Sequence, residues 1–178
     1  MPEWLRAPAL QAEEPDTLSL YGISLASYDA GRVYFIATKP ASGQPPKPLI
    51  PYTSSQEPLF RLNPQQWLQC SDHPGEAHVR KIFARACTDP ITTLIEISDS
   101  LACIEVCGPN SAALLRSGCS VDLDEASFEP GQYADTLLAQ MDVRIHRVKD
   151  SLCYRLYVDR SLAEHLWQWL QQGVEDFN

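Results

Sequence analysis

Cysteine is the residue type of this chain best suited to chemistry, because a thiolate can bind a metal ion or attack an electrophile. Cys103 and Cys107 have the closest spacing, but residues four apart in a strand lie about 13 Å apart, too far to share one zinc ion. Disulfide frameworks are typical of short secreted chains, and this chain has 178 residues. We therefore expect reduced thiols packed as small hydrophobes; the six cysteines are Cys70, Cys87, Cys103, Cys107, Cys119 and Cys153.

The other reactive side chains are dispersed along the sequence. Asp122 and Asp124 could act as paired carboxylates in acid–base catalysis, but a solvated loop with turn-forming aspartates explains them better. His146 alternates with apolar residues in a strand-like segment, which predicts that it lies on the polar face. The sequence contains no phosphate-binding glycine pattern and no nucleophile elbow. We therefore predict no catalytic residue, no cofactor-binding residue and no metal site on this chain.

Two tryptophans are candidates for contacts with a partner protein. Trp169 falls on the apolar stripe of a C-terminal helical pattern, so packing explains it. Trp167 falls off this stripe, and an exposed tryptophan more often marks a protein contact than a cofactor site. Trp67, which follows the turn Asn63-Pro64, is the other candidate.

The charge balance limits the classes of partner. Lys and Arg number 14 against 23 Asp and Glu, which gives a formal net charge of −9. Because phosphate binding needs clustered Lys and Arg, nucleic acid and anionic membrane surfaces are poor partners. No stretch approaches about 18 uncharged apolar residues, and the N-terminus lacks the apolar run of a signal peptide. We expect a cytoplasmic protein without a membrane anchor.

Hydrophobic periodicity predicts an α+β fold, with a mainly antiparallel sheet and three helices. Ile91 to Ile97 is predicted to form a hairpin with Leu101 to Cys107 across the turn Asp99-Ser100. The other predicted strands are Arg32 to Thr38, Leu59 to Leu62, Ala134 to Ala139, Val143 to Val148 and Leu152 to Val158.

The predicted helices follow start and stop signals. One begins near Asp72 and runs to about Cys87. A second, Ser111 to Ser117, is stopped by Gly118. The last begins at a capping box formed by Ser161 and Glu164, carries Leu162, Leu166, Trp169 and Leu170 on one face, and ends at Gly173.

Proline divides the chain. Between residues 40 and 58 the sequence contains Pro40, Pro45, Pro46, Pro48, Pro51 and Pro58. Because proline lacks the amide donor, this segment is expected to be an extended arm or long loop. We predict an N-terminal region of residues 1–58, comprising a lead-in, a strand and the proline-rich arm, followed by an α+β domain over residues 59–178.

From Leu62 to Leu170 the order of motifs resembles the γ subunit family of heterotetrameric sarcosine oxidase. The segments that carry the resemblance are LNPQQWL (62–68), TLIEISDSLACIEVCGPNSAALL (93–115), SVDLDEASFEPGQYADTLLA (120–139) and YVDRSLAEHLWQWL (157–170). That family is itself similar to the folate-binding domain of the aminomethyltransferase of glycine cleavage. The resemblance therefore implies an aminomethyltransferase-like α+β fold.

The resemblance also implies a function and partners. In such complexes sarcosine is oxidatively demethylated to glycine, hydrogen peroxide is released, and the one-carbon unit leaves on tetrahydrofolate or as formaldehyde. The resemblance implies that FAD, FMN, NAD and tetrahydrofolate are bound by the larger subunits, and that this chain is a small non-catalytic subunit that stabilises the large (α) subunit. The alternative is a stand-alone folate-binding protein of one-carbon transfer that uses the same fold.

The residues that match the family motifs are expected to have structural roles. Gly108-Pro109 would end a strand and start a helix, and Gly131 and Thr136 would shape a turn and a strand. Asp122 belongs to the Val-Asp-Leu motif and Ser161 to a helix cap. Residues 1–58 match poorly, so the proline-rich arm is expected to be particular to this protein.

Overall fold

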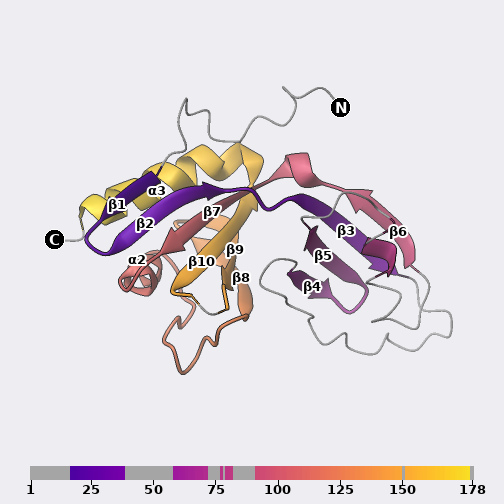
Figure 1. Cartoon of the computed structure of the whole chain (residues 1–178), viewed down its shortest axis with the longest axis horizontal. Helices are drawn as coiled ribbons and strands as arrows, with labels where there is room; N and C mark the ends of the chain where they lie inside the picture. Colours follow the sequence, from indigo (N-terminus) through magenta and orange to yellow (C-terminus); the bar gives the residue numbers. More distant parts are fainter. Residues whose placement is uncertain are drawn as a thin grey trace. The chain divides into compact units, whose positions relative to one another are not determined.

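The structure, a computed structural model, describes residues 17–38, 58–71, 77, 79–81, 91–149 and 151–176. The chain divides into two compact units (Figure 1). The larger unit consists of Met1–Asp29 with Asp99–Asn178, and the smaller unit of Ala30–Ser98. The division of the chain at residues 58 and 59 stays a prediction.

The larger unit is built on a six-stranded antiparallel sheet, in the order β1-β2-β7-β10-β9-β8. The strands in the last third of the chain begin and end within two residues of the predicted bounds, because apolar and polar residues alternate regularly there. The bounds are β1 Thr17–Leu20, β2 Ile23–Tyr28, β7 Leu101–Cys107, β8 Tyr133–Leu138, β9 Met141–Arg147 and β10 Cys153–Asp159.

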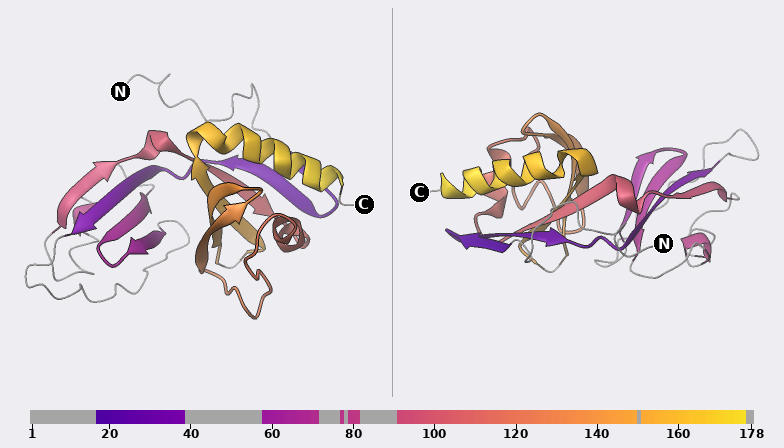
Figure 2. Two further views of the ribbon diagram at one scale, coloured as in Figure 1. Left: turned by 180° about the vertical axis from the view of Figure 1, so that it is seen from behind. Right: turned by 90° about the horizontal axis from the view of Figure 1, so that it is seen from above.

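Two helices complete the larger unit. Helix α3 (Ala163–Glu175) contacts β1, β2 and β7, and α2 (Ser111–Arg116) packs against α3 (Figure 2). The sheet presents alternate residues to them, including Ile104 and Val106 of β7, which are fully buried. Burial of this apolar face is the main stabilising contribution, at about 25 cal/mol per Å². The described helices include none with the length and apolar character needed to span a bilayer.

The smaller unit has a four-stranded antiparallel sheet, in the order β4-β5-β3-β6. The bounds are β3 Arg32–Thr38, β4 Leu59–Asn63, β5 Gln66–Ser71 and β6 Ile91–Glu96. Strand β5, which the sequence did not predict, pairs with β4 across the expected turn after Asn63. Four buried residues of one sheet face form a core cluster with Val79, which belongs to the helical residues 79–81; the four are Tyr34, Ile36, Leu59 and Trp67.

The predicted hairpin between residues 91–97 and 101–107 is wrong. β6 pairs with β3, whereas β7 pairs with β2 on one side and with β10 on the other. A short 3-10 helix, η2 (Ser98–Ser100), separates the two strands where a hairpin turn was expected. The two neighbouring apolar segments thus belong to different sheets, because each pairs with strands distant in the sequence.

The start of α3 also differs from the prediction. The 3-10 helix η3 (Arg160–Leu162) precedes α3, and Asp159 caps it by accepting hydrogen bonds from the Ser161 N–H and hydroxyl, at 2.8 and 2.6 Å. Glu164 instead accepts from Gln168, one turn further along. The capping box is therefore wrong: the chain leaves β10 through a tighter turn, which moves the cap two residues earlier.

The buried face of α3 is rotated relative to the predicted stripe. Trp167 is 3% exposed, whereas Leu162 is 36% exposed. Gly173 does not end the helix. A Cβ there would lie 2.6 Å from Leu114 Cδ1, so glycine at this position allows Leu114 of α2 to pack closely against α3. The buried residues of α3 are Ala163, Leu166, Trp167, Leu170 and Val174.

Several predictions from the sequence fall outside the described residues. These include the lead-in before Thr17, the proline-rich arm after Thr38, and Cys87. Of the helix predicted from Asp72 to Cys87, the described residues 77 and 79–81 are helical.

The rotated face of α3 predicts the effects of two substitutions. Trp167→Ala should lower the free energy of unfolding by about 3–5 kcal/mol, because it leaves a large cavity between helix and sheet. Leu162→Ala, at a position on the stripe expected from the sequence, should cost less than about 1 kcal/mol. Urea unfolding of both variants measures these values, and equal losses would contradict the observed orientation.

Candidate functional site

The Gly-Pro motif forms the junction between β7 and α2. Gly108 has φ +114°, and a Cβ there would lie 2.2 Å from the carbonyl oxygen of Gly22. Asn110 donates its side-chain amide to the Tyr21 carbonyl at 2.8 Å, and Tyr21 itself has a positive φ of 51°. The Gly108 N–H donates to the Leu152 carbonyl at 2.8 Å. The motif therefore joins three chain segments at one end of the sheet.

The carboxylates of the loop after α2 stabilise the loop itself. Asp122 accepts from the Asp124 N–H at 3.1 Å. Hydrogen bonds from the Ser127 side chain and the Asp124 backbone, with the charge of Arg116, hold the Asp122 pKa below its usual value. Asp124 forms an ion pair with Arg116. The low pKa of Asp122 suits an anion in a turn, not a general acid, and this supports the structural interpretation.

Three further motif residues lie in a turn, in an outer strand and beside a helix cap. Gly131 has φ +89°, and its N–H donates to the Arg147 carbonyl at 2.7 Å. Thr136 lies in the outer strand β8 and is half-buried. Ser161 hydrogen-bonds to the Asp159 cap, which lowers the Asp159 pKa.

Two cysteines form a disulfide, which corrects the expectation of six reduced thiols. Cys107 and Cys153 are register partners on β7 and β10, with Cα atoms 4.1 Å apart. Their sulfur atoms lie within 4.8 Å of a Glu105 carboxylate oxygen, but bonded sulfurs offer no thiolate to a metal ion. Cys70 and Cys103 are buried, Cys119 is half-buried, and none of these three cysteines forms a disulfide.

A row of charged side chains crosses the sheet face opposite α3. Arg155 donates to Glu105 at 3.0 Å, and its guanidinium stacks 3.7 Å from the centre of the Tyr28 ring. His146, the register partner of Arg155, lies on the face that its alternation predicts, but it is only 1% exposed. Burial, with the positive charges of Arg155 and Lys149, lowers the pKa of His146 from 6.5 to about 4. The histidine is therefore neutral at pH 7.

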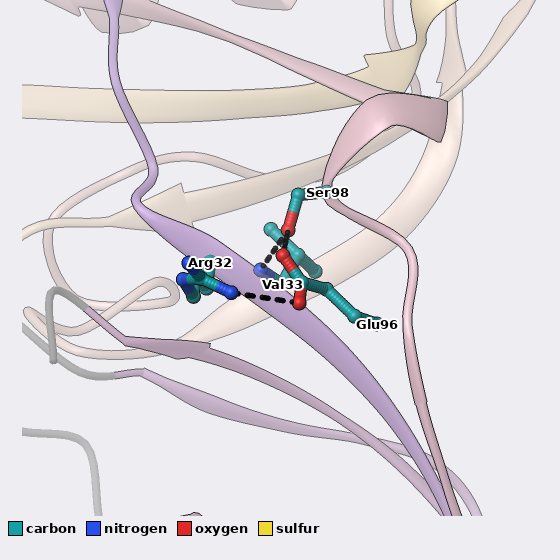
Figure 3. Close-up of polar contacts among 4 residues, drawn as sticks. All are labelled: Arg32, Val33, Glu96 and Ser98. Atoms are coloured by element: carbon teal, nitrogen blue, oxygen red, sulfur yellow. Dashed lines mark hydrogen bonds and ion pairs between the residues drawn. The ribbon is translucent and has the colours of Figure 1, made fainter. Parts of the chain in front are cut away.

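The smaller unit contains a cluster of polar side chains where β3 and β6 meet (Figure 3). Arg32 donates to one carboxylate oxygen of Glu96 at 2.9 Å, and the Ser98 hydroxyl donates to the other at 3.1 Å. The same hydroxyl accepts from the Val33 N–H at 3.0 Å. The negative charge of Glu96 raises the pKa of Arg32. A hollow of about 210 Å³ beside the cluster is lined by Arg32, Tyr34, Leu94 and Glu96.

Neither polar cluster resembles a catalytic constellation. In the Arg32 cluster the Ser98 hydroxyl donates to a carboxylate that is already paired with Arg32. The Arg155 row places a neutral histidine beside two residues that are paired with each other. Sequence reasoning missed both clusters. Glu105 and Arg155 interrupt apolar strands, which was a usable signal, whereas Arg32 and Glu96 are 64 residues apart and carried none.

Both tryptophans considered as partner contacts are buried. Trp67 lies in the core of the smaller unit, and Trp167 lies between α3 and its sheet. The prediction of partner contacts at these positions therefore has no support, because both indoles are buried within the chain.

Comparison with known proteins gives the family. The family model of the GCVT N-terminal domain matches residues 58–178. The chain belongs to this family. The fold class predicted from the sequence, α+β with a mainly antiparallel sheet, is confirmed for this family member.

The resemblance to the sarcosine oxidase γ subunit is also confirmed. The sarcosine oxidase subunit gamma of Corynebacterium sp. (strain P-1) is 26% identical over 116 residues, 65% of this chain and 56% of that protein. This chain thus matches little more than half the length of that relative.

Two solved structures share the fold. A chain of heterotetrameric sarcosine oxidase from Corynebacterium sp. U-96, in complex with pyrrole 2-carboxylate, superposes with a TM-score of 0.72 and 18% identity, covering 91% of this chain and 88% of that chain. Glycine cleavage system aminomethyltransferase T from Bartonella henselae superposes with a TM-score of 0.55 and 14% identity, covering 84% and 45%.

The close backbone contact at Gly108 predicts a stability effect. Gly108→Ala should lower the free energy of unfolding by about 3 kcal/mol, because the methyl group meets the Gly22 carbonyl and the residue has an unfavourable φ. Asn110→Ala, which removes one hydrogen bond from the same junction, should cost about 1 kcal/mol. Urea unfolding measures both losses, and a harmless Gly108→Ala would show that the junction can relax.

Burial of neutral His146 predicts a pH dependence of stability. Its pKa is lower in the folded chain than the unfolded value of 6.5, so the unfolded chain binds more protons as the pH falls from 6.5 towards 4. Stability should fall in this window by up to about 3 kcal/mol through His146. His146→Gln should remove this component, whereas His165→Gln, at an exposed position of α3, should retain it. Unfolding between pH 7.5 and 4 tests this, and matching pH profiles for wild type and His146→Gln would contradict it.

Proposed function

We propose that this chain is the small, non-catalytic subunit of a heterotetrameric complex of the sarcosine oxidase type, and that it stabilises the large flavoprotein subunit. In this proposal the complex converts sarcosine to glycine, releases hydrogen peroxide, and transfers the one-carbon unit to tetrahydrofolate or releases formaldehyde.

The observation that supports the proposal most strongly is the share of each similar chain that the fold of this chain covers. The fold of this chain accounts for 88% of the matching sarcosine oxidase chain, but for only 45% of the aminomethyltransferase. A subunit of matching size is thus a better model for this chain than a complete transferase. The identity of 26% to the γ subunit of one sarcosine oxidase points in the same direction.

The side chains support a docking role. Within the described residues, the clusters of charged groups are engaged in ion pairs, and the carboxylates of the loop after α2 form turn contacts. The hollow at the Arg32 cluster is also small beside typical ligand pockets of about 300–1,000 Å³. We therefore assign the flavins, NAD and tetrahydrofolate to the larger subunits.

Co-expression tests the proposal. The large subunits encoded in the same host should form a soluble, yellow and active complex together with this chain, and should lose yield or activity when the chain is omitted. The visible absorption spectrum reports the flavin, and peroxide release with sarcosine reports activity. A complex that assembles and works equally well without the chain would contradict the proposed role.

A control separates the stand-alone alternative. Isothermal titration of the isolated chain with tetrahydrofolate should give no heat of binding if the folate site belongs to a larger subunit. Micromolar binding by the chain alone would favour a folate-binding protein that acts by itself.

A further inference from the structure

Strand β6 is the outer strand of the smaller unit's sheet, and one of its edges has no partner strand among the described residues (Figure 1). The Ile97 N–H donates to the Val33 carbonyl at 2.8 Å, towards β3. In an antiparallel pair, the amides of every second residue of a strand face the partner strand, so those of Thr93 and Ile95 also face β3. The N–H and C=O groups of Leu94 and Glu96 therefore point away from the sheet.

The side chains of β6 do little to protect this edge, because its one charged side chain, that of Glu96, is paired with Arg32. Exposed edges are commonly protected by Lys, Pro or a bulge. Ile91–Glu96 contains neither Lys nor Pro, and its irregular pairing with β3 lies at the Ile91 end, so the stretch from Thr93 to Glu96 is regular. Ile95 is 50% exposed on this stretch. The strand thus combines outward hydrogen-bonding groups with an exposed apolar side chain.

A polar cluster and a hollow lie beside this edge. Arg32 and Ser98 donate hydrogen bonds to the two carboxylate oxygens of Glu96, at the end of the strand (Figure 3). Leu94 and Glu96, the residues with outward backbone groups, also line the hollow of about 210 Å³ together with Tyr34. An added strand could place one side chain there, with its stem on Leu94 and Tyr34 and a polar end near Glu96.

We infer that β6 binds an extended segment of the large partner subunit. This segment pairs with the outer edge of β6 and becomes the fifth strand of the sheet. This inference rests on the proposed function. Backbone hydrogen bonds to Leu94 and Glu96 would supply affinity, and the hollow and Ile95 would supply selectivity, as in other cases of strand addition.

Two other occupants fit less well. A second copy of this chain would bring together two proteins that each carry a net charge of −9, which opposes association. The segment of residues 39–57 is a poor ladder partner because proline lacks the amide donor; its prolines are Pro40, Pro45, Pro46, Pro48 and Pro51. A partner segment that is not acidic meets neither obstacle.

Hydrogen exchange of the full chain, alone and in the co-expressed complex, tests the inference directly. Amides of the peptide covering residues 91–97 should exchange about tenfold more slowly in the complex, because Leu94 and Glu96 gain acceptors. The peptide covering Tyr133–Leu138, from the outer strand β8 of the other sheet, is the internal reference and should change less. Unchanged exchange at residues 91–97 in an assembled complex would overturn the inference.

A pair of matched variants gives a second measurement. Ile95→Lys places a charge on the exposed position of β6 and should weaken assembly about tenfold. Leu137→Lys is the control, because Leu137 is 49% exposed on β8, and it should change assembly by less than about twofold. Thermal unfolding of each isolated variant verifies that it is folded.

The outcomes separate this inference from the proposed function. Failure of the wild-type chain to assemble with any large subunit would contradict the proposed function. Normal assembly by Ile95→Lys, without protection of β6, would overturn the strand-addition inference alone. An isolated wild-type chain that is dimeric, and becomes monomeric on Ile95→Lys, would identify a second copy as the occupant and also overturn it.

Discussion

The backbone ladder of β7 holds the larger unit together, because it joins chain segments that are far apart in the sequence. On one side β7 pairs with β2, and on the other with β10. Its alternate residues Ile104 and Val106 lie in the apolar core with α3, while Glu105 pairs with Arg155 on the opposite face. The disulfide and the Gly108 junction both lie at the end of this strand. Loss of β7 would thus remove the sheet, the core and the junction together.

Local patterns of the sequence predicted the elements well and their partners poorly. The segments Arg32 to Thr38 and Leu101 to Cys107 are strands with the expected bounds, because period-two alternation is a local property. The expected hairpin after Ile97 failed, since pairing depends on which distant strands complete each apolar face. The Cys107–Cys153 bond was missed for the same reason: it depends on the register of two strands, and composition alone argued for thiols.

The start of α3 shows how a small local difference from the predicted structure changes which side chains are exposed. A 3-10 turn after β10 replaced the expected capping box, and the face of α3 that meets the sheet therefore includes Trp167. An indole expected at a partner surface became part of the core. The proposed contact surface lies on β6 instead, where outward backbone groups lie beside a cluster of residues that are distant in the sequence. The family motif that includes Thr93–Glu96 gave no indication of a contact.

The division of the larger unit by an inserted segment has a consequence for the order of synthesis. Residues 30–98 are continuous, so the four strands of the smaller unit emerge from the ribosome in one uninterrupted stretch. Strand β2, by contrast, emerges before them, and its partner strand β7 is synthesised more than 70 residues later. Contacts of such long sequence separation slow folding and leave an apolar strand exposed in the meantime. The nascent chain is therefore expected to depend most on chaperones between completion of the smaller unit and release of α3.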